Sequence, residues 1–380
     1  MLTQLRFKNW RSLKDVTIDD LQPINVFIGA NSAGKTNILD ALYFLRWALT
    51  NGIRDAYYRY ASLYEFRTLT EPKQAVELSF TYSTKIGNKT KLLTYTLSML
   101  DEDLSPSEIL KDSENIIWME SEFRKTKVRN ADGTISEADS SDLGLSAFGR
   151  INTYPEIQHT FQFITQRWQM LDENFSPPLS LPIDSKKNID LIDPCADNLP
   201  TILNAIYKSQ PEKYAELQEV AQWLLDHVSQ LKVERTDLET RVIVEEKAFK
   251  NREAPTISAG TARLLAMLTA YYALDMRLKE MPGLIVIEEP DTALNPGLLG
   301  RFVSQLRNYT EGEYPRQFIL TTHNPAFLDY FKPEEVRVVE RDNQGYTHVK
   351  RIPEHIREIW LDEYGLGEVW MTNSLGGIPE

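Results

Sequence analysis

The alternation of apolar and polar positions predicts strands in the first third of the chain. QLRFKNW and KDVTI alternate in this way and predict paired strands, and INVFIG is a continuous apolar run that predicts a buried strand ending in glycine. Residues 74–130 supply three further candidate strands, AVELSFTY, KLLTYTLSML and NIIWME, separated by polar turns. This pattern is typical of an antiparallel meander.

Helical spacing of apolar residues appears in NILDALYFLRWAL and again over residues 199–229, and alternating strands follow near KVERTDLETRVIVEE. Later in the chain, a helix over residues 261–279, the strand GLIVIEE, a helix over residues 295–308, the strand RQFILTT and a helix at AFLDYF alternate. Such alternation favours a mostly parallel sheet. Residues 150–200 are rich in proline and give no clear element, and SPPLSLPID there is typical of an irregular segment.

Composition places the chain among ordinary globular proteins. It has 380 residues, of which 42% are hydrophobic and 26% charged, and Cys195 is its single cysteine. One cysteine forms no internal disulfide and fits no cysteine-based zinc pattern, which favours a reducing compartment. The start, MLTQLRFKNWRSL, lacks the apolar core of a signal peptide, and no run reaches the ~18 apolar residues that a membrane span needs. We therefore expect a cytoplasmic protein without a membrane partner.

The charge is unevenly distributed along the chain. The net charge is −13, which excludes a uniformly basic nucleic-acid binder. Residues 1–60 sum to +3 and residues 61–250 to −10. Residues 101–122 carry eight acids and one lysine, and the basic patch FRKTKVR follows them directly. We interpret the acidic run as a solvated loop face or, alternatively, as a docking surface for a basic partner.

The strand INVFIG is followed by a glycine-rich loop that matches G-x-x-x-x-G-K-[ST] in full. The loop consists of Gly29, Ala30, Asn31, Ser32, Ala33, Gly34, Lys35 and Thr36. Backbone N–H groups of such a loop can wrap phosphate oxygens at the N-terminus of the next helix. The Lys35 ammonium can reach the β and γ phosphates, and the Thr36 hydroxyl can ligate magnesium. The strand before the loop and the helix after it make a chance match improbable.

A second motif, LIVIEEP at residues 284–290, is a buried strand that ends in two carboxylates. Beside a phosphate loop, the first carboxylate can hold magnesium and the second can polarise an attacking water. This is the Walker B arrangement. We predict that Glu288 is the magnesium-side carboxylate, although aspartate is commoner there, and that Glu289 is the general base.

Two weaker signals follow the same order along the chain. Ser258 and Gly260 form an S-x-G pattern at the start of a helix, which is either an anion site or a plain helix cap. His323 directly follows the strand RQFILTT, where it could contact a γ phosphate or the hydrolytic water, although a lone histidine is usually structural.

The glycine-rich loop, the S-x-G pattern, the Walker B strand and His323 follow one another in this order along the chain. Together they resemble the ABC-type ATPase heads of the SMC, RecF and OLD group, and especially the stand-alone AAA15/AAA21-type ATPases. The opening LRFKNWRSLKDVTI, Asn37 after the loop and SLGGIPE near the end are similar to this group. The resemblance implies an α/β P-loop NTPase head with an antiparallel β-subdomain and a helical insert. We see neither coiled-coil heptads nor an acidic nuclease triad, so we expect no intrinsic DNA cleavage.

The resemblance also implies how the chain is divided. We expect the N-terminal part of the ATPase core at residues 1–60 and a β-rich subdomain at 61–135. An insert, irregular and then helical and ending in strands, would occupy residues 136–250. The C-terminal part of the core, with the S-x-G pattern, Walker B and His323, would occupy residues 251–380.

The implied activity is Mg²⁺-dependent ATP hydrolysis in a head-to-tail homodimer. Each nucleotide would be bound by the loop residues 29–36 with Asn37 of one subunit and by Ser258 and Gly260 of the other. Relatives of this kind commonly work beside a separately encoded nuclease or effector in defence against phage, and we expect the same use here. Two alternatives are a RecF/SMC-like factor in DNA repair or recombination and an ATP-bound scaffold that sequesters a toxin. DNA binding by the chain alone is expected to be weak.

Overall fold

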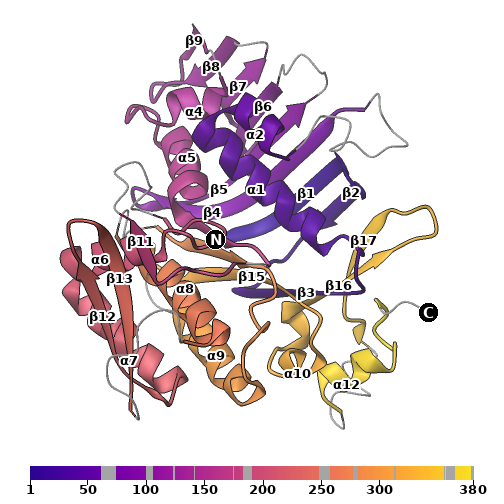
Figure 1. Cartoon of the computed structure of the whole chain (residues 1–380). Helices are drawn as coiled ribbons and strands as arrows, with labels where there is room; N and C mark the ends of the chain where they lie inside the picture. The colour runs from indigo at the N-terminus through magenta and orange to yellow at the C-terminus, as the bar shows by residue number, and fades with distance from the viewer. Residues whose placement is uncertain are drawn as a thin grey trace. The chain divides into compact units, whose positions relative to one another are not determined.

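A computed structural model describes most of the chain (Figure 1). Contacts between residues divide the chain into two units. The first unit comprises Met1–Trp168 and Pro333–Glu380, and the second comprises Gln169–Lys332. The described residues are 1–60, 74–99, 106–122, 125–140, 142–173, 175–182, 191–247, 257–276, 281–311, 314–354, 356 and 364–377.

An antiparallel sheet of eight described strands forms much of the first unit. In spatial order the strands are β2 (Leu13–Ile18), β1 (Leu2–Trp10), β4 (Val76–Ile86), β5 (Lys89–Met99), β6 (Pro106–Asp112), β7 (Ile117–Glu122), β8 (Lys125–Arg129) and β9 (Ile135–Asp139). The predicted pairing of the first two strands and the predicted meander are both confirmed. Because β1 also pairs with β4, the opening strands and the meander belong to one sheet.

Helices cover this sheet through an aromatic core. They are α1 (Lys35–Asn51), α2 (Ile53–Tyr60), α4 (Gly144–Phe148) and α5 (Pro155–Arg167), and α5 contacts β4, β5 and β7. The ring of Tyr82 on β4 stacks on that of Phe163 on α5, with 4.5 Å between the centroids. The Tyr82 hydroxyl is within 3.0 Å of the hydroxyl of Thr160, so the polar end of this buried tyrosine is satisfied.

Most of the described part of the acidic run forms strands, which corrects its interpretation as a loop face. Residues 106–112 and 117–122 are β6 and β7, and the side chains of β6 are alternately buried. Glu108 points inward, where it accepts hydrogen bonds from the Tyr95 hydroxyl at 2.7 Å and from the N–H groups of Gly144 and Leu145. Burial raises the pKa of Glu108 to about 7. Its structural role is therefore to hold the first turn of α4 on the sheet.

The first unit also contains the strand that carries the phosphate loop. This strand, β3 (Ile24–Ile28), is buried throughout and pairs in parallel with β16 (Val336–Arg341), which pairs antiparallel with β17 (Thr347–Arg351). A short 3-10 helix, η2 (Pro333–Glu335), leads into β16, and α12 (Leu366–Met371) follows β17.

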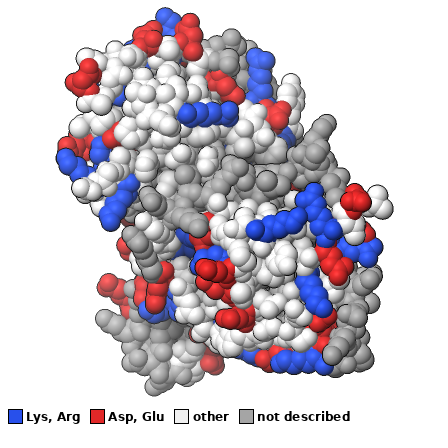
Figure 2. Space-filling model, turned by 90° about the vertical axis from the view of Figure 1, so that its left-hand side faces the viewer, with Lys and Arg blue, Asp and Glu red and all other residues white. Residues whose placement is uncertain are grey.

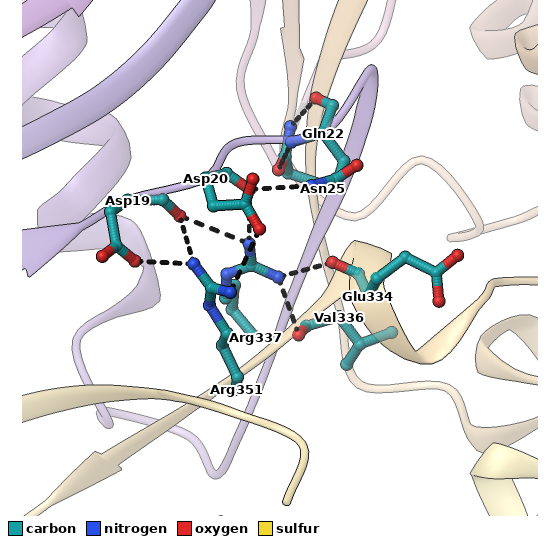
Figure 3. Close-up of polar contacts among 8 residues, drawn as sticks. All are labelled: Asp19, Asp20, Gln22, Asn25, Glu334, Val336, Arg337 and Arg351. Carbon is teal, nitrogen blue, oxygen red and sulfur yellow. Dashed lines mark hydrogen bonds and ion pairs between the residues drawn. The ribbon is translucent and has the colours of Figure 1, made fainter. Parts of the chain in front are cut away.

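Two arginines fasten β16 and β17 to the turn between β2 and β3 (Figure 3). The guanidinium of Arg337, only 2% exposed, donates to the backbone carbonyls of Asp19, Asp20, Glu334 and Val336. Arg351 lies nearer the surface and forms ion pairs with the carboxylates of Asp19 and Asp20. Since β3 begins directly after this turn, the cluster holds the strand that leads to the phosphate loop.

The second unit contains a parallel pair of strands, β14 (Gly283–Ile287) and β15 (Arg316–Thr322), with β10 (Trp168–Leu171) on the other side of β14. Its helices are α6 (Leu199–Ser209), α7 (Pro211–Leu224), α8 (Ala259–Ala273), α9 (Pro296–Tyr309) and α10 (Pro325–Leu328). A smaller antiparallel sheet has the order β11 (Ser180–Pro182), β13 (Glu239–Glu246) and β12 (Val228–Arg235). Among all described helices, none is long and apolar enough to cross a bilayer.

The α/β fold class is confirmed, and most predicted elements are present within a few residues. Helix α8 starts two residues before its prediction and ends at Ala273, and α10 spans four residues only. The segment taken as irregular, SPPLSLPID, contains the short strand β11. The four predicted ranges follow chain order, whereas the units divide at residues 168 and 332, and the predicted roles of the ranges stay predictions.

We predict that Arg337 matters more for stability than Arg351, although both belong to one cluster. Arg337→Met leaves several buried carbonyls without a donor and should lower the free energy of unfolding by about 2–4 kcal/mol. Arg351→Met removes half-exposed ion pairs and should cost at most about 1 kcal/mol. Urea unfolding of the two variants and the wild type measures the difference. Equal losses would show that Arg337 does not hold the turn.

Candidate functional site

The phosphate loop lies between β3 and α1 in the first unit, as the sequence predicts. Its backbone enters the left-handed region at Gly29 (φ 151°), Ser32 (φ 64°) and Gly34 (φ 112°). Ser32 adopts this conformation although it has a side chain, so the absence of a glycine there does not prevent the turn. Helix α1 begins at Lys35, which places the loop at a helix N-terminus.

A series of connected hydrogen bonds from other elements holds the loop. The side-chain amide of Asn37 donates to the Ser12 hydroxyl at 2.6 Å, and that hydroxyl is 2.7 Å from the Thr347 hydroxyl. Thr347 in turn donates to the carbonyl of Ala33 at 2.7 Å. A Cβ atom on Gly34 would lie 2.1 Å from Thr347 Oγ1, so only glycine permits this contact. We missed Thr347 in the sequence because it lies more than 300 residues from the loop.

Lys35 and the exposed residues of the loop have different surroundings. The Lys35 side chain is buried, and its ammonium donates to the carbonyls of Gly29 at 2.8 Å and Ala30 at 3.0 Å. Asn31, Ser32 and Thr36 are exposed on the loop. The exposed residues are thus accessible to an anion, and the lysine already lies against the loop.

Asn37 was predicted to bind the nucleotide, but its described contacts are with the protein. Besides donating to Ser12, its side-chain oxygen accepts from Arg11 at 3.5 Å, and its carbonyl accepts from the Trp10 indole at 2.9 Å. Arg11 also forms an ion pair with Asp40 on α1. Burial raises the pKa of the Asp40 carboxyl, and the adjacent guanidinium opposes that rise. These contacts join the β1–β2 turn to the first turns of α1.

In the second unit, the two carboxylates follow directly after β14. Glu288 is buried, and its N–H donates to the carbonyl of Leu171 on β10. Glu289 has a left-handed backbone (φ 47°), and its N–H donates to the Thr321 hydroxyl at 3.1 Å. Such a conformation is uncommon for a residue with a side chain and is typical of functional sites.

His323 lies beside the predicted general base. Its Nε2 atom is 3.5 Å from Oε1 of Glu289, and the other carboxylate oxygen accepts from the Thr292 hydroxyl. The neighbouring Asp291 accepts from the Thr322 hydroxyl at 2.8 Å, and burial raises the pKa of its carboxyl. The structure therefore brings together Glu289 and His323, which are 34 residues apart in the chain.

Arg263 on α8 is a site residue that the sequence analysis missed. Its guanidinium donates to the carbonyls of Glu173, Phe175 and Glu289 and lies 3.8 Å from the centroid of the Phe175 ring. Burial lowers the pKa of this guanidinium. In the sequence, the signal for this role was a single arginine in a helix whose other residues are mostly apolar. The structure shows that this helix is almost wholly buried.

The S-x-G pattern opens α8, and its two residues have different local roles. Ser258 is exposed and caps the helix, because its hydroxyl accepts from the Thr261 N–H at 3.2 Å. Gly260 allows a close approach, since a Cβ atom there would lie 2.3 Å from the carbonyl oxygen of Ala293. Both residues thus have a structural function whether or not they also bind an anion.

The predicted site residues form two groups, one in each unit. The loop, Lys35, Thr36 and Asn37 belong to the first unit, and Ser258, Gly260, Glu288, Glu289 and His323 belong to the second. A strand, phosphate loop and helix together with a Walker B strand define the class of the protein as a P-loop ATPase of the ABC type. The chain belongs to the AAA_21 family, described as "AAA domain, putative AbiEii toxin, Type IV TA system", which matches residues 24–329.

Local similarity connects the chain to curated proteins. It is 52% identical over 44 residues to the DNA replication and repair protein RecF of Acinetobacter baumannii, a match that covers 12% of each chain. It is 43% identical over 56 residues to RecF of Lactococcus lactis subsp. cremoris, covering 15% of each. An ATP/GTP phosphatase of Helicobacter pylori is 42% identical over 45 residues, covering 12% of each. The matches thus span a small part of these relatives.

Two solved structures share the fold over nearly the whole chain. One is the SMC head domain from Thermotoga maritima, with a TM-score of 0.50, 12% identity and coverage of 93% of this chain and 99% of that one. The other is the Smc head domain of Pyrococcus furiosus bound to the C-terminal domain of ScpA, with a TM-score of 0.56, 12% identity and coverage of 95% and 98%. The predicted resemblance to SMC, RecF and AAA21-type ATPases is therefore confirmed.

Proposed function

We propose that the chain hydrolyses ATP with Mg²⁺ and uses the reaction as a switch for dimerisation. The observation that carries this proposal is the phosphate loop, which has its left-handed residues, buried Lys35 and connected hydrogen bonds already in place. A preformed loop at a helix N-terminus binds phosphate without a further ordering cost.

Each predicted residue has a chemical role in this reaction. The Thr36 hydroxyl and the Glu288 carboxylate are oxygen ligands of the kind that Mg²⁺ prefers, and few protein ligands are needed because the ion keeps waters and phosphate oxygens. Bound Mg²⁺ would neutralise charge on the β and γ phosphates. Glu289 would orient and deprotonate the attacking water, and His323, 3.5 Å from its carboxylate, would hold that carboxylate or contact the γ phosphate.

The dimer in this proposal is head-to-tail, with Ser258 and Gly260 completing the nucleotide site of the partner subunit. The exposed position of Ser258 at the N-terminus of α8 supports such a role. Positioning and electrostatic stabilisation dominate catalysis of phosphoryl transfer, so a site completed by a second subunit couples hydrolysis to assembly.

The biological output that we propose is control of a separately encoded nuclease or effector in defence against phage. The family description, which names the matching domain a putative toxin of a toxin–antitoxin system, supports a place in a system of more than one component. In this scheme ATP closes the dimer and hydrolysis opens it, and the partner responds to the closed state. A scaffold that only sequesters a toxin would not need Glu289.

A RecF/SMC-like role in DNA repair is the second candidate, because several curated relatives are RecF proteins. The charges of the first unit argue against a strong intrinsic DNA site. Arg6, Lys8 and Arg11 are paired with Asp15, Glu77 and Asp40, and Lys14 lies over the ring of Tyr346. Basic and acidic groups are also interspersed on the face shown in Figure 2. Arg124, in the basic patch FRKTKVR, lies outside the described residues.

Turnover tests the assigned roles. Glu289→Gln should keep ATP affinity but slow hydrolysis by about 10²-fold or more, because the base is lost while the phosphate cradle remains. Lys35→Ala should instead weaken ATP binding. Isothermal titration and phosphate release measure the two effects. If Glu289→Gln hydrolyses ATP at a near-normal rate, Glu289 is not the base.

Mixing of variants tests the shared site. Ser258→Arg should bind ATP yet fail to hydrolyse it, because a bulky cation blocks the helix end that faces the partner's γ phosphate. Ser258→Ala is the comparison variant, because it removes the hydroxyl, with its helix cap and its proposed phosphate contact, but adds neither bulk nor charge. A dimer of one Ser258→Arg subunit and one Lys35→Ala subunit contains one intact composite site, so mixing the two inactive variants should restore part of the activity. Should ATP-dependent association in light scattering be unchanged in both variants, Ser258 does not act in trans.

A salt titration of DNA binding separates the two candidate outputs. We expect weak binding, because Arg6, Lys8 and Arg11 of the described first unit are already paired with acids. We expect this binding to fall steeply with salt, since phosphate contacts would dominate it, and to become stronger with ATP. Tight binding that is independent of both salt and nucleotide would favour a constitutive DNA-binding protein.

A further inference from the structure

The segment after α12 returns to the phosphate loop within the first unit. Residues 373–377 turn sharply, with left-handed backbones at Asn373 (φ 58°), Gly376 (φ 77°) and Gly377 (φ 77°). The turn is ordered by a hydrogen bond from the Gly376 N–H to the carbonyl of Asn373. It brings Gly377 against Gly29, the first residue of the phosphate loop.

The approach between these two glycines is backbone to backbone. A Cβ atom on Gly377 would lie 3.2 Å from the Cα atom of Gly29 and 3.1 Å from Cγ1 of Val338. A Cβ atom on Gly29 would lie 2.1 Å from the carbonyl oxygen of Val339. The first loop residue is therefore confined between β16 and the segment 373–377. Space and its φ angle both require glycine at Gly29, whereas at Gly377 the φ angle favours glycine and a side chain would crowd Gly29.

Glu340 anchors the segment to β16. Its Oε1 atom accepts a hydrogen bond of 3.1 Å from the Gly377 N–H, and its other carboxylate oxygen pairs with Lys350 on β17. A Cβ atom on Gly376 would lie 1.9 Å from the same Oε1 atom. One carboxylate thus joins the segment to the sheet that carries the loop.

The segment also borders a cavity of about 480 Å³ beside the loop. Among the residues that line it are Ala30, Asn31 and Ser32 of the loop, Glu340 and Arg341 at the end of β16, and Gly377. The same glycine therefore contacts the first loop residue and forms part of the wall next to it.

We propose that residues 373–377, anchored by Glu340, are a positioning element of the phosphate loop that sets its affinity for the nucleotide triphosphate. The affinity part of this inference rests on the proposed ATPase function. The segment limits the motion of Gly29, from which the loop turns, so the loop amides keep the orientation that a phosphate needs. Gly377 and Glu340 act through the loop and are positioning residues.

The test compares two glycines with similar backbone angles. Gly377→Ala places a methyl group against Gly29, whereas Gly345→Ala, at φ 87° in the β16–β17 turn, has no atom within 4 Å of its new Cβ. Both variants carry the strain of a left-handed alanine, so the difference between them reports the contact with the loop. Hydrogen exchange of peptides that cover residues 27–38, in protein without nucleotide, measures the effect on the loop.

We expect Gly377→Ala to speed exchange of this peptide by about fivefold or more, and Gly345→Ala to leave it within about twofold of the wild type. The KM for ATP should rise by about tenfold in Gly377→Ala only, with kcat changed by less than about twofold, because Glu289 is untouched. A merely structural defect would lower the active fraction and kcat without raising KM.

A second pair of variants keeps the backbone unstrained. Glu340→Ala removes the acceptor of the Gly377 N–H, and Lys350→Ala removes the ion pair but leaves that hydrogen bond in place. Faster loop exchange in Glu340→Ala and not in Lys350→Ala supports the proposal. Unchanged loop exchange in both Gly377→Ala and Glu340→Ala overturns it. Failure of the wild type to bind ATP would overturn the ATPase function instead, because the exchange measurement does not involve ATP.

Discussion

The carbonyl of Ala33 and the hydroxyl of Thr347 make the contact on which the phosphate loop depends. A loop that turns its N–H groups toward a phosphate must adopt left-handed angles and leave part of its own hydrogen bonding unsatisfied. Such a backbone persists only when surrounding elements hold it. Here β17 supplies Thr347, the β1–β2 turn supplies Ser12 and α1 supplies Asn37. Residues from both ends of the chain thus fix one short turn.

In the second unit, neighbouring residues hold the left-handed backbone of Glu289 in a similar way. Its left-handed backbone is held on the N–H side by Thr321 and on the carbonyl side by Arg263, while Thr292 and His323 lie at its carboxylate. Burial of Arg263 in a mostly apolar helix is costly, and its bonds to three backbone carbonyls offset that cost. A general base must be oriented as well as present, and these contacts would orient Glu289 in the role that we propose for it.

The two groups of residues suit a switch that works by assembly. The residues proposed for phosphate binding and those proposed for water activation belong to separate units, and Ser258 is exposed at a helix N-terminus in the second. In the proposed mechanism, nucleotide and partner subunit together complete the site, so the energy of ATP binding is used to stabilise one assembled state. The family, the SMC-like fold and the RecF matches all agree with a P-loop ATPase of the ABC type.

The sequence by itself determined the elements and the motifs whose signals are local. The buried strand β3, the loop from Gly29 to Thr36 and the carboxylates after β14 were found because apolar runs, glycines and charges lie next to one another in the chain. The parts that it did not reveal are contacts across long separations. Thr347 carries no local pattern, and nothing in the tail SLGGIPE indicated that Gly377 contacts the phosphate loop. Arg263 gave only a faint signal, and residues 106–112 and 117–122 of the acidic run are strands with Glu108 inside. Only the tertiary structure decides such roles, because they depend on which backbone happens to approach which side chain.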